Sequence, residues 1–518
     1  MNRFDRRKFL QGIAAGGALL ASGDYAFAGA MTHALPPVAT PGFNPDIELE
    51  LNAVADSIAV LPGNATRVWR YNGRVLRGNP QTLGMLDGSG HIPIIRARRG
   101  QKIRIHFSNQ LPEDSIVHWH GLHIVQRMDG HPMYAIGPGK KFVYEFVIDN
   151  RAGTYWFHPH PHGRTGAQVY YGLTGLLLIG DDEEDAAKLP RNELDLPLVI
   201  QDRTFGARNE LIYVGQSMHD RMMGRMMGFS GQQVLVNGNP GYSRTVPRAA
   251  HRLRLFNGSN STLYRLQWSN GKPFTVLGTD GGLLERPMVR EHITLAAAER
   301  IDVWVDFSTH QPDDELALIA ESWSPALDNI TRMQSGAPMT ERGRPVARFR
   351  IGSGDAKKSV LPERLSTFPA LKLADAVNRD KPRSFQLSMM HGQGMLNGRS
   401  FGRMDEVVDH EKVKLGTTEV WEFSNDTNFG MRMAHPMHVH NLQFRVIGRS
   451  RTGRSNPLLQ DLGAGLTDEG LKDVVLVMPG ERVRVLMKFE NHTGLYLYHC
   501  HILEHEDIGM MRNYLAQG

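Results

Sequence analysis

The sequence predicts an all-β protein made of three β-sandwich domains, and three observations point to this fold. The 518 residues include 54 glycines and 28 prolines, and 41% are hydrophobic, which is typical of a turn-rich globular protein. Short stretches that alternate polar and apolar residues recur along the chain, with turn residues between them. Two short histidine-containing patterns occur in the first third and again in the last third, which indicates that one domain has been copied.

The first 28 residues are interpreted as a twin-arginine export signal. Arg6 and Arg7 form the arginine pair, an apolar stretch runs from about residue 12 to residue 22, and residues 26–28 form a small-x-small cleavage site. The apolar stretch is about half the roughly 20 residues that a membrane-spanning helix needs, so we expect cleavage and no permanent membrane anchor. The twin-arginine export machinery would then deliver the mature protein to the periplasm. The net charge of +5 is spread along the chain, which speaks against a nucleic-acid partner.

The first domain is expected at residues 46–185. Alternating stretches at 66–71 and 102–107 predict strands, and an acidic run at 181–185 closes the domain. Two groups of closely spaced histidines follow these strands and carry the chemistry of the domain: His118, His120, His158, His160 and His162.

The second and third domains are expected at residues 190–352 and 376–518. The second also alternates polar and apolar residues but contains no His-x-His pair. A polar, proline-containing stretch at 353–375 is interpreted as the linker between them. The third domain holds the remaining closely spaced metal-ligand types of the chain: His435, His438, His440, His499, Cys500, His501, His505 and Met510.

The copied patterns show where a shared site is expected. Residues 117–122 parallel residues 437–442, and residues 153–160 parallel residues 494–501. If each copy supplies two histidine pairs, the simplest geometry is one site at the interface of the first and third domains. The second domain would then be a spacer and a wall.

The histidine pairs are too frequent to be accidental. With 23 histidines in 518 positions, random placement gives about one His-x-His pair, whereas this chain has five. Four of the five lie in the copied stretches. Imidazole nitrogens suit copper, and a single thiolate argues against a sulfur-rich zinc site. We therefore interpret the pairs as metal ligands rather than as surface or core histidines.

The only cysteine of the chain, Cys500, stands between two histidines. A cysteine, histidines and a weak axial methionine such as Met510 make the ligand set of a type 1 copper site. Neighbouring side chains of an extended strand point to opposite faces, so His499 and His501 are expected to face one way and Cys500 the other. One short strand would then contact two metal centres.

The four histidine segments resemble the four copper-binding signatures of the multicopper oxidase family. Two of them match its patterns His-Pro-x-His-x-His, beginning at His435, and His-Cys-His-x3-His-x4-Met, beginning at His499. The resemblance covers nearly all of the mature chain and implies three cupredoxin-like Greek-key β-sandwich domains with four copper ions. By position, the resemblance assigns the type 1 copper to His435, Cys500, His505 and Met510, the type 2 copper to His118 and His438, and the type 3 pair to His120, His158, His160, His440, His499 and His501. His162 lies outside the pattern and is interpreted as structural or as a neighbour of the ligands, and Asn441 stands where the family usually has glycine.

The mechanism implied by the resemblance is one-electron oxidation of a substrate at the type 1 copper and four-electron reduction of O2 to water. Electrons would enter through the outer edge of His505 or His435 and pass through Cys500 to its flanking histidines. Glu506 and Asp129 match acidic residues that carry protons in the copper-efflux branch of the family. The alternative for both is an exposed charge or a hydrogen bond to a ligand histidine.

Methionine is the main clue to the reducing substrate, because soft thioethers favour Cu(I). On a helix, positions four apart are neighbours, so a methionine-rich segment at 218–227 would form one thioether strip, although Gly224 and Gly228 weaken the expectation of a helix. The alternative is that the methionines pack or form a mobile lid. The candidates for contact with substrate Cu(I) are Met218, Met222, Met223, Met226, Met227, Met431 and Met433.

The chain resembles the periplasmic cuprous oxidases in its export signal, its axial methionine and the run His505–Asp507. It lacks their long methionine-rich insertion in the third domain, and Met431 stands where that branch has an aspartate. A laccase that oxidises phenols or aromatic amines is the close alternative. A periplasmic copper-binding protein with incidental redox activity and a non-enzymatic descendant of the fold are the others. We expect a monomer.

Overall fold

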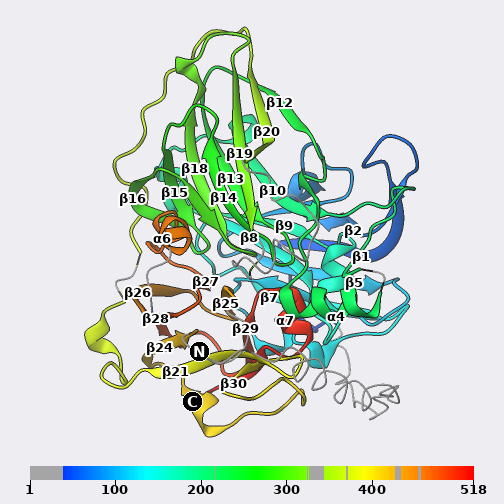
Figure 1. The fold of residues 1–518 in the computed structure, drawn as a ribbon, viewed down its shortest axis with the longest axis vertical. Coiled ribbons are helices and arrows are strands. Elements are labelled where there is room, and N and C mark those ends of the chain that lie inside the picture. Colours follow the sequence, from blue (N-terminus) through cyan, green and yellow to red (C-terminus); the bar gives the residue numbers. More distant parts are fainter. Residues whose placement is uncertain are drawn as a thin grey trace, which may run out of the picture. The chain divides into compact units, whose positions relative to one another are not determined.

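The computed structural model describes residues 39–215, 217–323, 325, 343–368, 371–425, 433–452 and 457–518, all of which belong to one unit, Pro36–Gly518. Strands dominate this part of the chain and form six sheets (Figure 1). Its helices are all too short or too polar to span a membrane. The predicted export signal and Met431 lie outside the described residues.

The first pair of sheets encloses one hydrophobic core. The strand β1(Ile47–Ile58) alternates inward residues such as Leu49 and Leu51 with outward ones, as a half-buried strand should. Trp119 and Phe157 join this core from the facing sheet. The two sheets have the order β2(Thr66–Arg77)-β1(Ile47–Ile58)-β5(Lys102–Asn109)-β7(Lys141–Val147) and β3(Leu83–Met85)-β4(Pro93–Arg98)-β9(Gly175–Gly180)-β8(Gly153–Pro159)-β6(Val117–His120).

The second pair is built in the same way around its own core, to which Leu255, Leu266 and Phe349 belong. Its sheets have the order β11(Gln233–Val236)-β10(Asp195–Arg203)-β13(Ala250–Asn257)-β18(Arg300–Asp306)-β15(Phe274–Thr279)-β16(Gly282–Arg290) and β12(Tyr242–Val246)-β20(Arg344–Ile351)-β19(Glu315–Trp323)-β14(Leu263–Trp268)-β17(Ile293–Leu295).

The third pair packs around Trp421, Tyr498 and their apolar neighbours. Cys500 and Met510 are part of the same core. The sheets have the order β22(Gln393–Leu396)-β21(Arg383–Met390)-β24(Thr418–Ser424)-β28(Glu481–Lys488)-β26(Phe444–Arg451) and β23(Lys412–Lys414)-β30(Met511–Gln517)-β29(Gly494–Cys500)-β25(His435–Val439)-β27(Val474–Val477).

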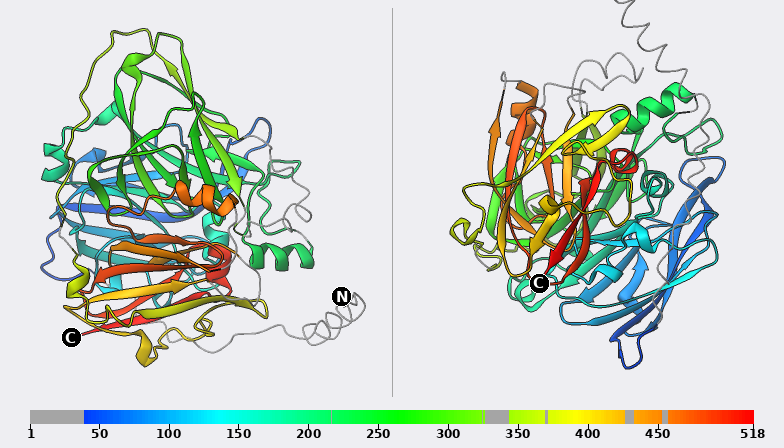
Figure 2. Two further views of the ribbon diagram at one scale, coloured as in Figure 1. Left: turned by 60° about the vertical axis from the view of Figure 1, so that its left-hand side comes forward. Right: turned by 90° about the horizontal axis from the view of Figure 1, so that it is seen from below.

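Short helices connect the strands. Two of them, α4(Met218–Met227) and α2(Thr165–Tyr170), pack against α7(Leu503–Asp507), which follows the cysteine-bearing strand. Figures 1 and 2 show α4 at the edge of the molecule. The α-helices of the described residues are α2(Thr165–Tyr170), α3(Asp182–Ala186), α4(Met218–Met227), α6(Pro457–Ala464) and α7(Leu503–Asp507). The 3-10 helices are η1(Pro80–Thr82), η2(Gln126–Met128), η3(Pro132–Tyr134), η4(Asn192–Leu194), η5(Phe307–Thr309), η6(Leu373–Asp375) and η7(Asp409–Glu411).

The copied patterns occupy equivalent strand pairs. β6 pairs antiparallel with β8 and sets His118 opposite His158, while β25 pairs antiparallel with β29 and sets His438 opposite His499. The all-β sandwich fold expected from the sequence is confirmed. The domain boundaries stay predictions, although no described strand runs across residues 181–194 or 352–382.

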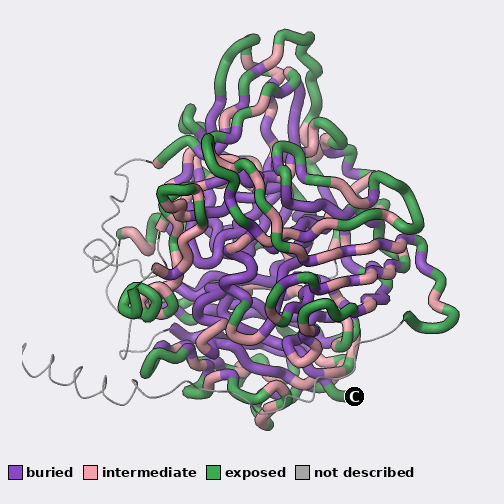
Figure 3. Tube along the Cα trace, turned by 90° about the vertical axis from the view of Figure 1, so that its right-hand side faces the viewer, coloured by how far each residue is buried: buried purple, intermediate pink, exposed green. Residues whose placement is uncertain are grey.

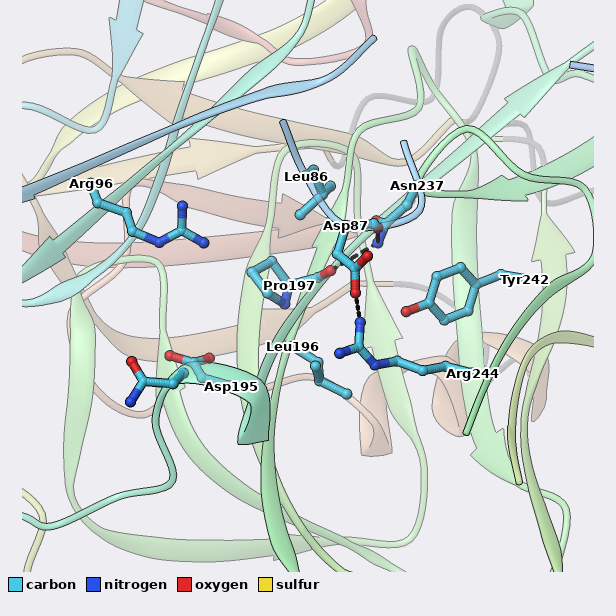
Figure 4. A pocket seen from close by; sticks show the side chains of 10 residues that line it. Leu86, Asp87, Arg96, Asp195, Leu196, Pro197, Asn237, Tyr242 and Arg244 are labelled. Carbon is cyan, nitrogen blue, oxygen red and sulfur yellow. Dashed lines mark hydrogen bonds and ion pairs between the residues drawn. The ribbon is translucent and has the colours of Figure 1, made fainter. Parts of the chain in front are cut away.

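A small cavity of about 120 Å³ lies between the first two pairs of sheets (Figure 4). Leu86 and Arg96 line it from the first pair, and Asp195 and Tyr242 line it from the second. Two of its lining residues, Arg244 and Asp87, form an ion pair with each other. None of the predicted copper ligands lines this cavity.

Candidate metal centre

Eight histidines converge where the first and third pairs of sheets meet. They come from β6, β8, β25 and β29 or the residues just after these strands, and each is at most 1% exposed. Figure 3 shows that the buried residues fill the middle of the molecule. The eight are the predicted ligands of the type 2 and type 3 coppers: His118, His120, His158, His160, His438, His440, His499 and His501.

Neighbouring rings of the eight histidines lie within contact distance of one another. The rings of His120, His158 and His501 have centroids 5.1–5.8 Å apart. Those of His160, His440 and His499 are 5.1–5.3 Å apart. His118 and His438 are 5.8 Å apart. The shortest separations, 3.8 Å, join His118 with His440 and His120 with His438, so the eight rings form one continuous cluster.

Hydrogen bonds to the outer ring nitrogens decide which nitrogen each ring turns inward. Nδ1 of His118 donates to the backbone carbonyl of Asp129 at 2.5 Å, and Nδ1 of His438 donates to that of Asp473 at 2.7 Å. A carbonyl oxygen accepts only, so the Nε2 atoms of both rings carry the lone pair. These two Nε2 atoms are buried without a hydrogen-bond partner. Such orphaned, inward nitrogens are what a metal ion would bind.

The electrostatics of the pocket keeps these rings available to a metal. Burial lowers the pKa of His118 to about 3 and that of His499 to about 4. The pKa of His158 is also far below its usual value, mainly because of burial and then because of the neighbouring histidines. Neutral imidazole is the form that binds copper. The donor set therefore fits copper.

A second cluster lies on the other face of β29. Sγ of Cys500 is 3.5 Å from Nδ1 of His435 and 3.7 Å from Nδ1 of His505. The turn of α7 returns the chain to this site, because the backbone N–H of Met510 donates to the carbonyl of His505 and that of Cys500 donates to the carbonyl of Met510. Burial raises the pKa of the Cys500 thiol, so metal binding there would displace a proton. His499 and His501 point to the other cluster, as expected for alternating side chains.

Met510, the predicted axial ligand, packs against a glycine in the neighbouring hairpin. A Cβ atom at Gly394 would lie 2.5 Å from Cβ of Met510. The strand β22 can therefore pack directly on Met510 only because this residue has no side chain.

Both predicted proton carriers lie against ligand histidines. The Glu506 carboxylate has Oε1 3.5 Å from Nδ1 of His160 and Oε2 3.3 Å from Nδ1 of His499. Oδ2 of Asp129 accepts from Nδ1 of His440 at 2.7 Å. Burial raises the pKa of both carboxyls. Both carboxyls are buried rather than exposed surface charges.

Two residues at this site had no signal in the sequence. Asp473 is buried, and its Oδ1 is 3.0 Å from Nε2 of His120. Arg300, from the second pair of sheets, binds both oxygens of Asp473 at 2.6 Å. Neither lies near a histidine of the predicted ligand pairs in the sequence. Asp473 precedes the apolar strand β27 and Arg300 begins β18, and both strands have the pattern of ordinary core strands.

The remaining candidates have different positions. The segment 218–227 is a helix, α4, and Gly224 faces Val214 while Gly228 ends the helix at φ 75°, which explains the two glycines. His162 contacts Phe401 and lies outside the histidine sets. Asn441 has φ 64°, a conformation that asparagine tolerates, and its side chain accepts from the N–H of Ile124. Met433 is fully buried.

Comparison with known proteins decides the family. Models of multicopper oxidase domains match residues 67–184 and 376–517. The chain belongs to the multicopper oxidase family. It is therefore an oxidoreductase that uses O2 as acceptor and copper as cofactor.

Relatives of this multicopper oxidase have different names. A laccase of Bacillus stratosphericus is 30% identical, with 86% of this chain and 90% of the relative covered. The structure of the McoA multicopper oxidase of Aquifex aeolicus is 34% identical with a TM-score of 0.76, covering 92% of this chain and 97% of that one. A multicopper oxidase of Campylobacter jejuni, described as a metallo-oxidase, is 26% identical with a TM-score of 0.71, covering 94% of both chains.

Proposed function

We propose that this multicopper oxidase oxidises Cu(I) in the periplasm and so contributes to copper tolerance. The observation that carries the proposal is the position of the methionine-rich helix α4 over the type 1 site. Nε2 of His505 donates to the backbone carbonyl of Met226 at 3.1 Å. The helix therefore covers the ring edge through which electrons would enter.

Two methionines of α4 are more exposed than packing would require. No described residue of the helix is buried, and the side chains of Met218 and Met222 are 80% and 51% exposed. A methionine that fills a core gap is buried, so packing does not explain them. Thioethers bind Cu(I) well. Met222 stands one turn, about 6 Å along the axis, before Met226, which brings a bound Cu(I) near His505.

The ligands are proposed as the resemblance assigned them, with four coppers in all. The type 1 copper would be held by His435, Cys500, His505 and Met510, and the other three by the eight convergent histidines. Bound copper would supply one-electron storage and reduction of O2 to water. Cys500 is covalently continuous with His499 and His501, so it joins the two sites through a few bonds.

The protein's own proton carriers are proposed to be Glu506 and Asp129. The first contacts His160 and His499 and the second contacts His440, so each places a carboxyl that can carry a proton beside the proposed O2-reducing site. Both are buried, which keeps their carboxyls protonated to higher pH than usual.

The cellular setting follows from the N-terminal pattern. Residues 1–28 match a twin-arginine signal, so export to the periplasm is proposed, without a permanent anchor and as a monomer. The Campylobacter jejuni relative described as a metallo-oxidase supports a metal substrate.

The test is O2 consumption by the copper-loaded enzyme with a stabilised Cu(I) complex and, separately, with dimethoxyphenol. The test variant has Met218, Met222, Met223, Met226 and Met227 changed to leucine. Met85→Leu is the control, because Met85 is also exposed, at 44%, but lies on β3. Cu(I) turnover should fall in the test variant, while phenol turnover holds or rises. Unchanged rates with both substrates would contradict the proposal.

The second candidate is a general laccase for phenols or aromatic amines. The laccase from Bacillus stratosphericus favours it. In that case α4 would act as a cover over His505, and the five methionines would be interchangeable with leucine. Equal Cu(I) turnover in the test and control variants would favour this function.

A further inference from the structure

The residue Asp473 links two ligand histidines. Its carboxylate Oδ1 is 3.0 Å from Nε2 of His120, and its backbone carbonyl accepts from Nδ1 of His438 at 2.7 Å. The carboxylate contact sets Nε2 of His120 outward, and Nδ1 of the same ring is buried without a partner. The position of the Asp473 carboxylate therefore decides which nitrogen His120 offers to a metal.

Arg300 holds that carboxylate in a single orientation. Its Nη1 and Nη2 atoms each lie 2.6 Å from one oxygen of Asp473, which is the two-pronged geometry that only a guanidinium provides. Its Nε donates to the carbonyl of Thr154, in the histidine-bearing strand β8, at 2.9 Å. The remaining two N–H groups donate to the carbonyls of Ala298 and Asp280. All five donors of this buried side chain are thus used.

The residue after His120 leaves room for the pair. Gly121 has φ 85°, and a Cβ atom there would lie 2.5 Å from Oδ2 of Asp473 and 3.2 Å from Nη2 of Arg300. A side chain at this position would push the carboxylate away from the ring. The backbone, the carboxylate and the guanidinium therefore fit together around His120.

We propose that Arg300, which is not a copper ligand, is a positioning residue for His120 and acts through Asp473. The second domain thereby takes part in the O2-reducing site. A hydrogen-bond partner that fixes a ligand histidine typically changes metal affinity or activity about 10–100-fold when it is lost. This inference concerns the ligand cluster and does not depend on whether the reducing substrate is Cu(I) or a phenol.

The alternative is that Arg300 is only a buried ion pair that joins the domains. A matched control separates the two, because Arg252 is also buried in the second domain, pairs with Asp302, and does not contact a ligand histidine or its partner. Arg300→Met and Arg252→Met both remove a buried guanidinium. Arg300→Lys keeps the charge without the two-pronged contact, and Asp473→Asn keeps the shape of the carboxylate without its charge.

The experiment measures copper per chain, the electron paramagnetic resonance signal of type 2 copper, the near-ultraviolet band of the type 3 pair and the blue type 1 band. We expect the affinity for type 2 and type 3 copper to fall about 10–100-fold in Arg300→Met, Arg300→Lys and Asp473→Asn. The blue type 1 band should remain in all three variants. Arg252→Met should keep all signals and lose only thermal stability.

The double variant of Arg300→Met with Asp473→Asn should show no further loss, because both changes act on one contact. Full copper with unchanged type 2 and type 3 signals in Arg300→Lys and Asp473→Asn would overturn the proposal. These two conservative variants decide the matter even if Arg300→Met does not fold.

Discussion

The backbone carbonyl of Met226 and the imidazole of His505 are joined by a hydrogen bond of 3.1 Å, so the last turn of α4 is attached to a proposed type 1 ligand. Gly228 ends this helix two residues later. Its φ is 75°, and a Cβ atom there would lie 2.8 Å from Cβ of Ser261. The contact between α4 and the ligand thus depends on a residue without a side chain.

Changing Gly228→Ala should therefore move the end of α4 away from His505. We expect a loss of about 1 kcal/mol in stability, because alanine disfavours this backbone conformation. Turnover of Cu(I) relative to dimethoxyphenol should fall, as measured by O2 consumption.

The control for this change is Gly271→Ala. Gly271 has a similar φ of 69°, but a Cβ atom there would meet nothing within 4 Å. Its backbone strain should cost a similar stability without changing the ratio of the two rates. The same ratio in both variants would show that α4 does not set substrate choice.

Cys500→Ser should abolish the blue absorption and lower turnover with any reductant by at least about 100-fold. The serine hydroxyl does not replace the thiolate between His435 and His505 as a copper ligand. The measurement is the visible spectrum with O2 consumption for both substrates. The near-ultraviolet type 3 band should persist, because the eight convergent histidines are untouched. A blue, active variant would refute the assignment of the type 1 site.

Glu506→Gln should slow O2 reduction by about 100-fold, because an amide beside His160 and His499 cannot take up and release a proton as a carboxyl does. Burial raises the pKa of Glu506, so the wild-type carboxyl carries a proton below that raised value and loses it as the pH rises through it. The wild-type turnover rate should fall on that alkaline side, and this dependence should be absent in the variant. Stopped-flow reduction of the type 1 copper without O2 should be unchanged.

The neighbouring change Glu504→Gln is the control for proton supply. Glu504 is buried but accepts hydrogen bonds from Tyr213 and Asn260 and is not in contact with the histidine cluster. O2 reduction should continue at the wild-type rate in this variant. A loss equal to that of Glu506→Gln would mean that any change in α7 disturbs the site.

Glu504 should also make the stability of the protein depend on pH. Burial raises its pKa from 4.5 to about 7, so the folded state favours the neutral carboxyl. The resulting stability is present below pH 4.5 and is lost as the pH rises through about 7, by an amount on the order of 3 kcal/mol. In Glu504→Gln, the melting temperature of the metal-free protein should depend less on pH between pH 5 and pH 8 than it does in the wild type. An unchanged slope would contradict the raised pKa.

The sequence predicts the candidate copper ligands better than the residues that hold them in place. The histidine pairs were found from spacing alone, because residues two apart on a strand share a face and His118 and His120 need only local structure to act together. The copied patterns also predicted that the first and third domains would meet at the site. The sequence predicted the helix at 218–227 less firmly, because Gly224 and Gly228 disfavour a helix. The reason for both glycines lies in tertiary contacts, since Gly224 packs against Val214 and Gly228 against Ser261.

The sandwich fold and the candidate copper ligands follow from short-range patterns in the sequence, and four histidine segments carry the resemblance to the family. The contacts of Arg300 with Asp473 and of Met226 with His505 appear only in the folded chain. These pairs are separated by 173 and 279 residues in the chain. Such contacts depend on how whole sheets pack, and packing energy is spread over many residues that carry no local pattern. The assignment of a role to the second domain therefore required the folded chain.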